Sequence, residues 1–183
     1  LQERVEAWLI SPRREAIPVD VVDLTGDTDA TRGYRRSAAA TILGADGRDL
    51  PVDADRIRGW RFRAVKRVTG PSGRTYSAPL ILGYVKAVSR ADSDAPVVLD
   101  EVASLEYLLH RTPLVGPATV MRWPTAVAGA IACVHLVFPA AIVRVDPRVV
   151  DAPVSTKTYE VGESVWTAAS DYALCAGAEL YCD

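Results

Sequence analysis

The sequence predicts an α+β chain rich in strands, and three stretches carry that prediction. Residues 59–89 contain two runs of β-branched and aromatic residues around the tetrad Gly70-Pro71-Ser72-Gly73, which is typical of a long β-hairpin. Residues 124–138 and 162–176 instead repeat apolar side chains at helical spacing. Together these stretches indicate a mixed, β-rich globular chain.

The first arm of the hairpin alternates strictly. Trp60, Phe62 and Ala64 fall on one face. The other face carries Arg61, Arg63, Val65 and Arg67. This alternation suits a strand with one face on a core and the other in water or against a partner. The second arm is more continuously apolar, and its Pro79 indicates that the strand begins, bulges or lies at a sheet edge there.

Length and composition limit the number of domains and the classes of protein to which the chain can belong. A chain of 183 residues is long enough for one full core or two small domains, and its apolar fraction of 49% argues against disorder. The net charge of −2 provides no global electrostatic case for binding nucleic acid or an anionic membrane. The sequence has no run of 18 apolar residues, so no membrane anchor is expected. The three cysteines lack metal-ligand spacing and are interpreted as buried or free thiols, without a disulfide framework: Cys133, Cys175 and Cys182.

The N-terminal half predicts further strands. Residues 1–14 form a short helix or an extended N-terminal arm, and Pro12 bounds it. Ile17–Leu24 alternates as a strand, and a polar turn joins it to a partner strand over Tyr34–Leu43. Val97–Leu99 indicates one more short strand before a helix over Val102–His110.

The C-terminal half is predicted to be mainly helical. Pro124–Phe138 forms one helix, and the small residues around its apolar face indicate burial on most of its surface. Ala140–Val145 reads as a following strand. A second helix runs from Val165 to a C-terminal glycine, Gly177. Residues 179–183 then begin a strand without a partner, so we expect a hairpin to continue past Asp183 and interpret the chain as a fragment.

No motif for catalysis or metal binding emerges. His110 and His135 have no carboxylate or cysteine at ligand spacing and are interpreted as structural. Asp23, Asp27 and Asp29 offer a possible carboxylate pair, but solvated turns are favoured because the stretch fails the EF-hand pattern. The sequence therefore predicts no catalytic residue, no metal site and no cofactor.

One charge feature stands out along the hairpin. The basic residues are Arg56, Arg58, Arg61, Arg63, Lys66, Arg67 and Arg74. So many basic residues along one hairpin would allow contacts with the phosphates of a nucleic acid. Without stacking aromatics on the same face, a nucleic-acid-binding module is the weaker interpretation. A solvated or subunit-facing strand edge with inter-chain salt bridges is favoured.

The order of these pieces resembles tail proteins of actinobacterial phages. The segments that carry the resemblance are PVDADRIRGWRFRAV (51–65), PLILGYVKAVSR (79–90) and SVWTAASDYALCAGAELYCD (164–183). The similarity covers most of residues 19–89 and 154–183, and the section 97–122 departs from it. Each motif alone is unspecific, so the resemblance depends mainly on the order of the motifs.

The resemblance implies the baseplate-hub or tail-hub fold of phage tails and contractile injection machines. That fold is α+β, a tube-like β-barrel hub domain with packed helices and an inserted α/β part. On this basis we expect an N-terminal arm over 1–16 and a first barrel part over 17–99. An α/β insertion over 100–158 and the helix–strand start of a further hub segment over 159–183 would follow.

The implied role is that of a non-enzymatic structural virion protein. Such a hub is a homotrimer at the phage tail tip that joins tail-tube or distal tail ring proteins to a central spike or fibre. It is made in the host cytoplasm and lines the channel through which DNA passes. Arg61, Arg63, Lys66 and Arg67 are then candidates for inter-subunit pairs or for the channel wall.

Two other classes of function stay open at this stage. A tail-associated cell-wall hydrolase would use paired Asp or Glu side chains in a cleft. A carbohydrate-binding adhesin would need an exposed aromatic platform. The four tryptophans are scattered at Trp8, Trp60, Trp123 and Trp166, and they form no cluster in the sequence.

Overall fold

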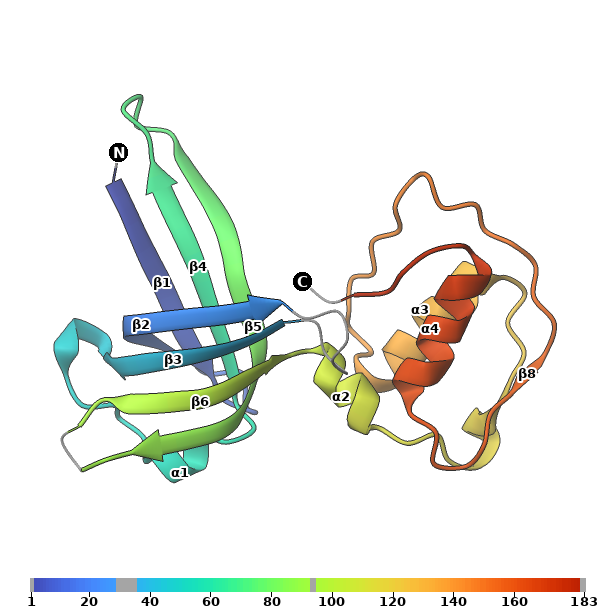
Figure 1. Ribbon diagram of the computed structural model, residues 1–183, viewed down its shortest axis with the longest axis horizontal. Helices are drawn as coiled ribbons and strands as arrows, with labels where there is room; N and C mark the ends of the chain where they lie inside the picture. Colours follow the sequence, from blue (N-terminus) through green and yellow to red (C-terminus); the bar gives the residue numbers. More distant parts are fainter. Residues whose placement is uncertain (1, 29–35, 93–94, 182–183) are drawn as a thin grey trace. The chain divides into compact units, whose positions relative to one another are not determined.

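The computed structural model describes residues 2–28, 36–92 and 95–181. The chain divides into two compact units, residues 1–105 (unit 1) and 106–182 (unit 2), each with its own hydrophobic core (Figure 1). No helix among the described residues has the length and apolar content needed to cross a membrane.

Unit 1 is an antiparallel sheet of six strands in the order β1-β2-β3-β6-β5-β4, closed by pairing between β4 and β1. Closure is narrowest between β1 and β2, which share only four residue pairs, from Ala7↔Val19 to Ile10↔Ala16. The two short helices of this unit are η1 (Ala45–Gly47) and α1 (Ala54–Ile57). The strands are β1 (Gln2–Ile10), β2 (Ala16–Thr28), β3 (Arg36–Gly44), β4 (Arg61–Thr69), β5 (Thr75–Arg90) and β6 (Val97–Ser104).

Alternating side chains fill the inside of this sheet. Leu9, Ile42, Phe62 and Leu99 are completely buried and come from four different strands. Gly83 on β5 lets the neighbouring strand approach, since a Cβ there would lie 2.2 Å from the carbonyl oxygen of Ala103. The core of unit 1 is therefore formed by every second side chain along its strands, and it requires the close backbone contact at Gly83.

The hairpin expected over residues 59–89 is present as β4 and β5. Phe62 and Ala64 are buried, as the alternation predicts, and Arg61 and Arg63 are exposed. Val65, expected on the exposed face, is buried instead. Beside Val65 the β4–β5 pairing passes from Ala64↔Ile81 to Val65↔Pro79, a bulge whose extra residue, Leu80, lies on β5, whereas β4 itself keeps its alternation along β1.

The N-terminus departs from the expected arm over 1–16. Residues 2–10 are the barrel strand β1, which pairs with β4 along its whole length. Ala7 and Leu9 are buried at alternate positions, as in a strand, so of the two alternatives for this segment the extended one is correct. In a segment of nine residues, the spacing of apolar residues does not distinguish a helix from a strand, and pairing with β4 makes this segment a strand.

Unit 2 is built on two helices, α3 (Ala126–Val137) and α4 (Val165–Cys175), which pack side by side (Figure 1). A Cβ at Gly129 would lie 2.3 Å from the ring of Tyr172, so glycine allows this close packing. Tyr172 is buried, and its hydroxyl donates to the carbonyl oxygen of Met121 at 3.3 Å. The smaller elements are α2 (Glu106–Arg111), η2 (Gly116–Thr119), β7 (Val120–Met121) and β8 (Lys157–Thr158), and β7 pairs with β8.

Both long helices lie where the sequence predicts them, although α3 begins at Ala126 instead of Pro124. Thr125 caps α3 by accepting a hydrogen bond from the backbone N–H of Ala128, and Ser164 caps α4 by accepting one from Thr167. Gly177 follows α4 with a positive φ of 63°. The α+β class is therefore confirmed.

Several boundaries differ from those expected. The helix expected over Val102–His110 begins only at Glu106, because β6 continues to Ser104 between β3 and β5. Ala140–Val145 and residues 179–181 form no strand, since no neighbouring strand pairs with them in the described structure. The segments expected over 100–158 and 159–183 do not separate at 158, because α3 and α4 share one core.

Candidate assembly surface

Three strands of unit 1 project beyond the rest of the sheet (Figure 1). We call this projection the wing and define it as residues 2–6 of β1, 65–69 of β4 and 75–82 of β5. Its middle strand, β4, is paired on both sides, with β1 and with β5. The wing is the part of unit 1 where strand edges and side chains are most available to another molecule.

The four basic residues expected to face a neighbour lie on β4, two of them in the wing, and each has a partner within the chain. Arg61 Nε donates to the hydroxyl of Tyr84 at 3.1 Å, and Arg63 lies 5.5 Å above the ring of Trp8. The other two contacts are ion pairs to β1: Lys66 Nζ to Glu3 at 2.8 Å and Arg67 Nε to Glu6 at 2.7 Å. Arg67 Nε makes no hydrogen bond, so its contact with Glu6 is ionic only.

These contacts connect β1 to β4 across the wing. Exposed ion pairs of this kind contribute about 0–1 kcal/mol each, because water and salt screen them. Arg61, Arg63 and Arg67 share one face of β4, and Lys66 lies on the other. The sequence therefore predicted one basic band, whereas the structure distributes it over both faces. A role for these residues toward DNA or a second subunit stays a prediction.

Free strand edges are a feature that sequence reasoning located only in part, because Pro79 left an edge as one of three alternatives. Pairing between β1 and β2 stops at Ala7, so within the described residues no strand pairs with residues 2–6 of β1 or residues 20–28 of β2 on that side. Pairing between β5 and β6 begins only at Gly83, so residues 75–82 of β5 are also free on one side. The signal for an edge was Pro79, which lies within that stretch.

The free stretches differ in charge. The β1 stretch carries Glu3, Arg4 and Glu6, and the β2 stretch carries three aspartates. The β5 stretch, TYSAPLIL, carries no charged residue, and its first six residues are all exposed. Natural proteins protect free edges with charges, so an uncharged free edge is an open template for another strand.

An apolar strip accompanies this edge. By register, Val5 and Ala78 flank Lys66, and Val68 lies next to Tyr76. These residues continue the inward face of the sheet beyond the point where the barrel covers it. Val5 is 43% exposed and Tyr76 is 64% exposed, so the strip is open to water. Edge and strip together form the candidate assembly surface.

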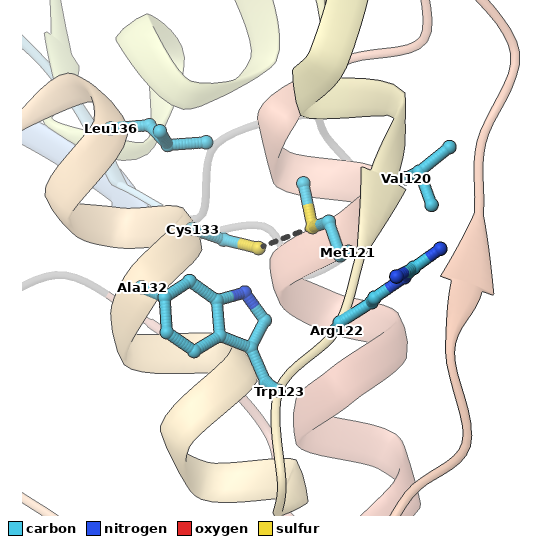
Figure 2. A pocket seen from close by; sticks show the side chains of 7 residues that line it. All are labelled: Val120, Met121, Arg122, Trp123, Ala132, Cys133 and Leu136. Carbon is cyan, nitrogen blue, oxygen red and sulfur yellow. Dashed lines mark hydrogen bonds between the residues drawn. The ribbon is translucent and has the colours of Figure 1, made fainter.

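Unit 2 contains a small apolar pocket of about 200 Å³ (Figure 2). Cys133 and Met121 face each other there with their sulfur atoms 3.4 Å apart, and Trp123 lies beside them. Burial raises the pKa of the Cys133 thiol to about 12, so it stays protonated near neutral pH. Its lining offers neither an activated nucleophile nor an acid–base pair. The other lining residues are Val120, Arg122, Ala132 and Leu136.

A polar cluster joins β8 to α4. Lys157 Nζ lies 2.5 Å from a carboxylate oxygen of Asp171 and 3.1 Å from the sulfur of Cys175. The hydroxyl of Tyr159 donates to the same oxygen of Asp171 at 2.9 Å. These two donors lower the pKa of Asp171, against the opposing effect of its partial burial. The cluster anchors the segment that leads into α4.

The remaining residues considered from the sequence do not converge. His110 stacks on Trp166 with ring centroids 4.9 Å apart, and one ring nitrogen of His135 lies 3.1 Å from the carbonyl oxygen of Ala141. Asp23 and Asp27 lie on β2, and Asp29 falls outside the described residues. Among the residues that the structure describes, no group of three His, Cys, Asp or Glu side chains is placed to hold a metal ion.

Comparisons with known proteins identify the fold. No protein-family model matches the sequence, and no curated protein matches it either. One solved structure is similar: the tail protein from Neisseria meningitidis MC58, with a TM-score of 0.57 and 13% sequence identity. The match covers 100% of this chain and 48% of that one, so this chain spans about half the length of its neighbour. At this identity the likeness concerns the fold, and it extends over both units.

Proposed function

We propose that this chain is a structural subunit of a phage-type tail, a hub that joins the tail tube to a central spike or fibre. The observation that carries the proposal is the fold likeness to a tail protein over the whole chain. The resemblance of the sequence to tail proteins of actinobacterial phages supports the same role. The chain would then be located in the virion at the tail tip after synthesis in the host cytoplasm.

The candidate assembly surface supports a role in binding other subunits rather than in catalysis. The wing offers an uncharged strand edge and an apolar strip, and both lose exposed surface when another molecule covers them. We propose a homotrimer around a channel. Three copies of a subunit with two related barrels would present a pseudo-sixfold ring to the tube and threefold symmetry to the spike.

The partners follow from that arrangement. Tail-tube or distal tail ring proteins would contact one side of the ring, and the spike or fibre protein the other. Arg61 and Arg63 are exposed on one face of β4, where they would meet a neighbouring subunit or passing DNA. The role is non-enzymatic and uses no cofactor.

Mass measurement in solution tests the proposal. The chain, produced within its full-length protein, should sediment as a trimer and bind the tail-tube protein of the tail to which it belongs. A monomer at every concentration, alone and with tube protein, would overturn the proposed function. Lytic activity on cell walls that disappears on substitution of Asp23 and Asp27 would overturn it as well.

A further inference from the structure

A strand-like segment of unit 2 lies free in the loop between α3 and α4. Residues 141–145, AIVRV, form neither helix, strand, turn nor bend, and we call them the free strand because their composition suits a strand. Ile142 is 88% exposed and Val145 is 43% exposed. In the described part of the chain, no hydrogen bond joins Ile142, Val143, Arg144 or Val145 to another residue.

Both ends of the free strand are fixed. At its start, the backbone N–H of Ala141 donates to Phe138 at 2.9 Å, and a ring nitrogen of His135 lies 3.1 Å from the Ala141 carbonyl oxygen. At its end, Arg148 makes two side-chain hydrogen bonds to Asp146, at 3.0 and 2.7 Å, which close a turn. The start of the segment is therefore tied to the end of α3, and a local turn follows its end, so it loses less entropy on pairing than a segment without such contacts.

The composition of the free strand is that of a strand within a sheet. Three of its five residues are β-branched, and such residues are enriched in strands because they fit a pleated, half-buried surface. An extended segment with unpaired N–H and C=O groups can add to an exposed sheet edge, with main-chain hydrogen bonds supplying affinity. The sequence predicted a strand here, and the structure lacks only its partner.

The acceptor can be chosen from the three free edges of unit 1. The stretches on β1 and β2 carry several charged residues, which protect a strand edge from pairing with another strand, whereas the free strand carries a single charge, Arg144. The β5 stretch over residues 75–82 carries none, and it is longer than the free strand. Tyr76 and Leu80 on it are exposed apolar side chains that can pack against Ile142, whereas Val145, three positions further along, would point to the opposite face.

We propose that the free strand of one copy adds to the β5 edge of a second copy. The proposal rests on the proposed function, since it requires that copies of this chain assemble. The contact joins two different surfaces, so it repeats from copy to copy and closes into a ring when the rotation allows. It identifies the segment through which unit 2 of one subunit meets unit 1 of the next.

Cross-linking between two differently tagged copies tests the contact directly. In a background with Cys175→Ser and Cys182→Ser, one copy carries Val143→Cys and the other carries Tyr76→Cys, Ala78→Cys or Leu80→Cys. Oxidation of the mixture should produce a disulfide between the two tags for at least one of the three positions. The matched control replaces the β5 cysteine with Val22→Cys, which is 61% exposed on the free stretch of β2.

Cross-linking no greater than that of the Val22→Cys control at all three β5 positions would overturn the proposal. So would a disulfide that forms only within one copy when both cysteines are placed on it. Neither outcome touches the fold likeness on which the proposed function depends.

A substitution in the free strand tests its energetic role. Val143→Pro removes an N–H that makes no bond within the described chain, so the thermal midpoint of the monomer should stay unchanged. Association should weaken by at least about tenfold, measured by sedimentation. Val150→Pro, in the same loop and 78% exposed, is the control and should assemble like the unmodified chain.

The outcomes separate the two proposals. Equal assembly of Val143→Pro and the unmodified chain overturns the free-strand contact and leaves the hub role standing. An unmodified chain that never assembles overturns both.

Discussion

The two units pair their backbone hydrogen-bonding groups and bury their apolar side chains in different ways. Unit 1 pairs its strands around a closed sheet and buries its apolar side chains inside it. Unit 2 consists of two helices, short elements and long irregular segments. Of the fourteen large apolar side chains that are exposed in the described chain, ten belong to unit 2. Exposed apolar side chains are therefore more frequent in unit 2, on its loops and helix faces, than on the closed sheet of unit 1.

The largest expected effect lies in the core of unit 1. Phe62→Ala removes a completely buried ring and should lower the free energy of unfolding by about 3–5 kcal/mol, because it leaves a cavity. The comparison variant, Ile142→Ala, truncates an exposed side chain of unit 2 and should stay within about 0.5 kcal/mol. Chemical denaturation of each variant measures both values. Equal effects would mean that the free strand is already packed in the isolated chain.

A smaller effect is expected at the helix pair of unit 2. Gly129→Ala places a methyl group against the ring of Tyr172 and should destabilise unit 2 by about 1–3 kcal/mol through overpacking. Ala132→Val, one turn along α3, points into the apolar pocket and should be nearly neutral. Hydrogen exchange, read separately for β4 and α4, would show the loss in α4 alone. A loss in both elements would show that the two units unfold together.

The stability of unit 2 should also depend on pH through His110. Burial against Trp166 lowers the pKa of His110, and the nearby Glu106 carboxylate only partly offsets this. A lowered pKa means that the fold favours the neutral ring. This contribution is present above the usual histidine pKa of about 6.5 and is lost as pH falls through the lowered value. His110→Gln should flatten the fall in thermal midpoint between about pH 7 and pH 5. An unchanged slope would assign the pH dependence to other groups.

The smallest effect is expected at the ion pairs of the wing. Lys66→Gln and Arg67→Gln should each cost about 0–1 kcal/mol, and less at high salt, because both pairs are partly exposed. Assembly measured by sedimentation separates two roles for these residues. If they only hold β1 against β4, assembly stays unchanged. If they contact a neighbouring subunit or DNA, assembly or DNA retention weakens by more than the change in stability explains.

The local sequence pattern was sufficient to predict those elements that depend on residues close together in the sequence. The β4–β5 hairpin follows from alternation around a Gly-Pro-Ser-Gly turn, and α3 and α4 follow from helical spacing, with Gly177 after the second. In each case neighbours in the sequence are also neighbours in space. The α+β class could therefore be predicted, together with the apolar face of β4.

Tertiary structure decided everything that depends on which strand lies beside which. Residues 2–10 became a barrel strand because β4 pairs with them, and Ala140–Val145 did not become a strand because nothing pairs with it in the described chain. The free edge of β5 exists because pairing with β6 starts only at Gly83. Hydrogen bonds between strands join residues far apart in the sequence, so no local pattern can show where pairing stops. That is why the sequence could identify the basic residues of the hairpin, whereas only the fold revealed the uncharged edge beside them.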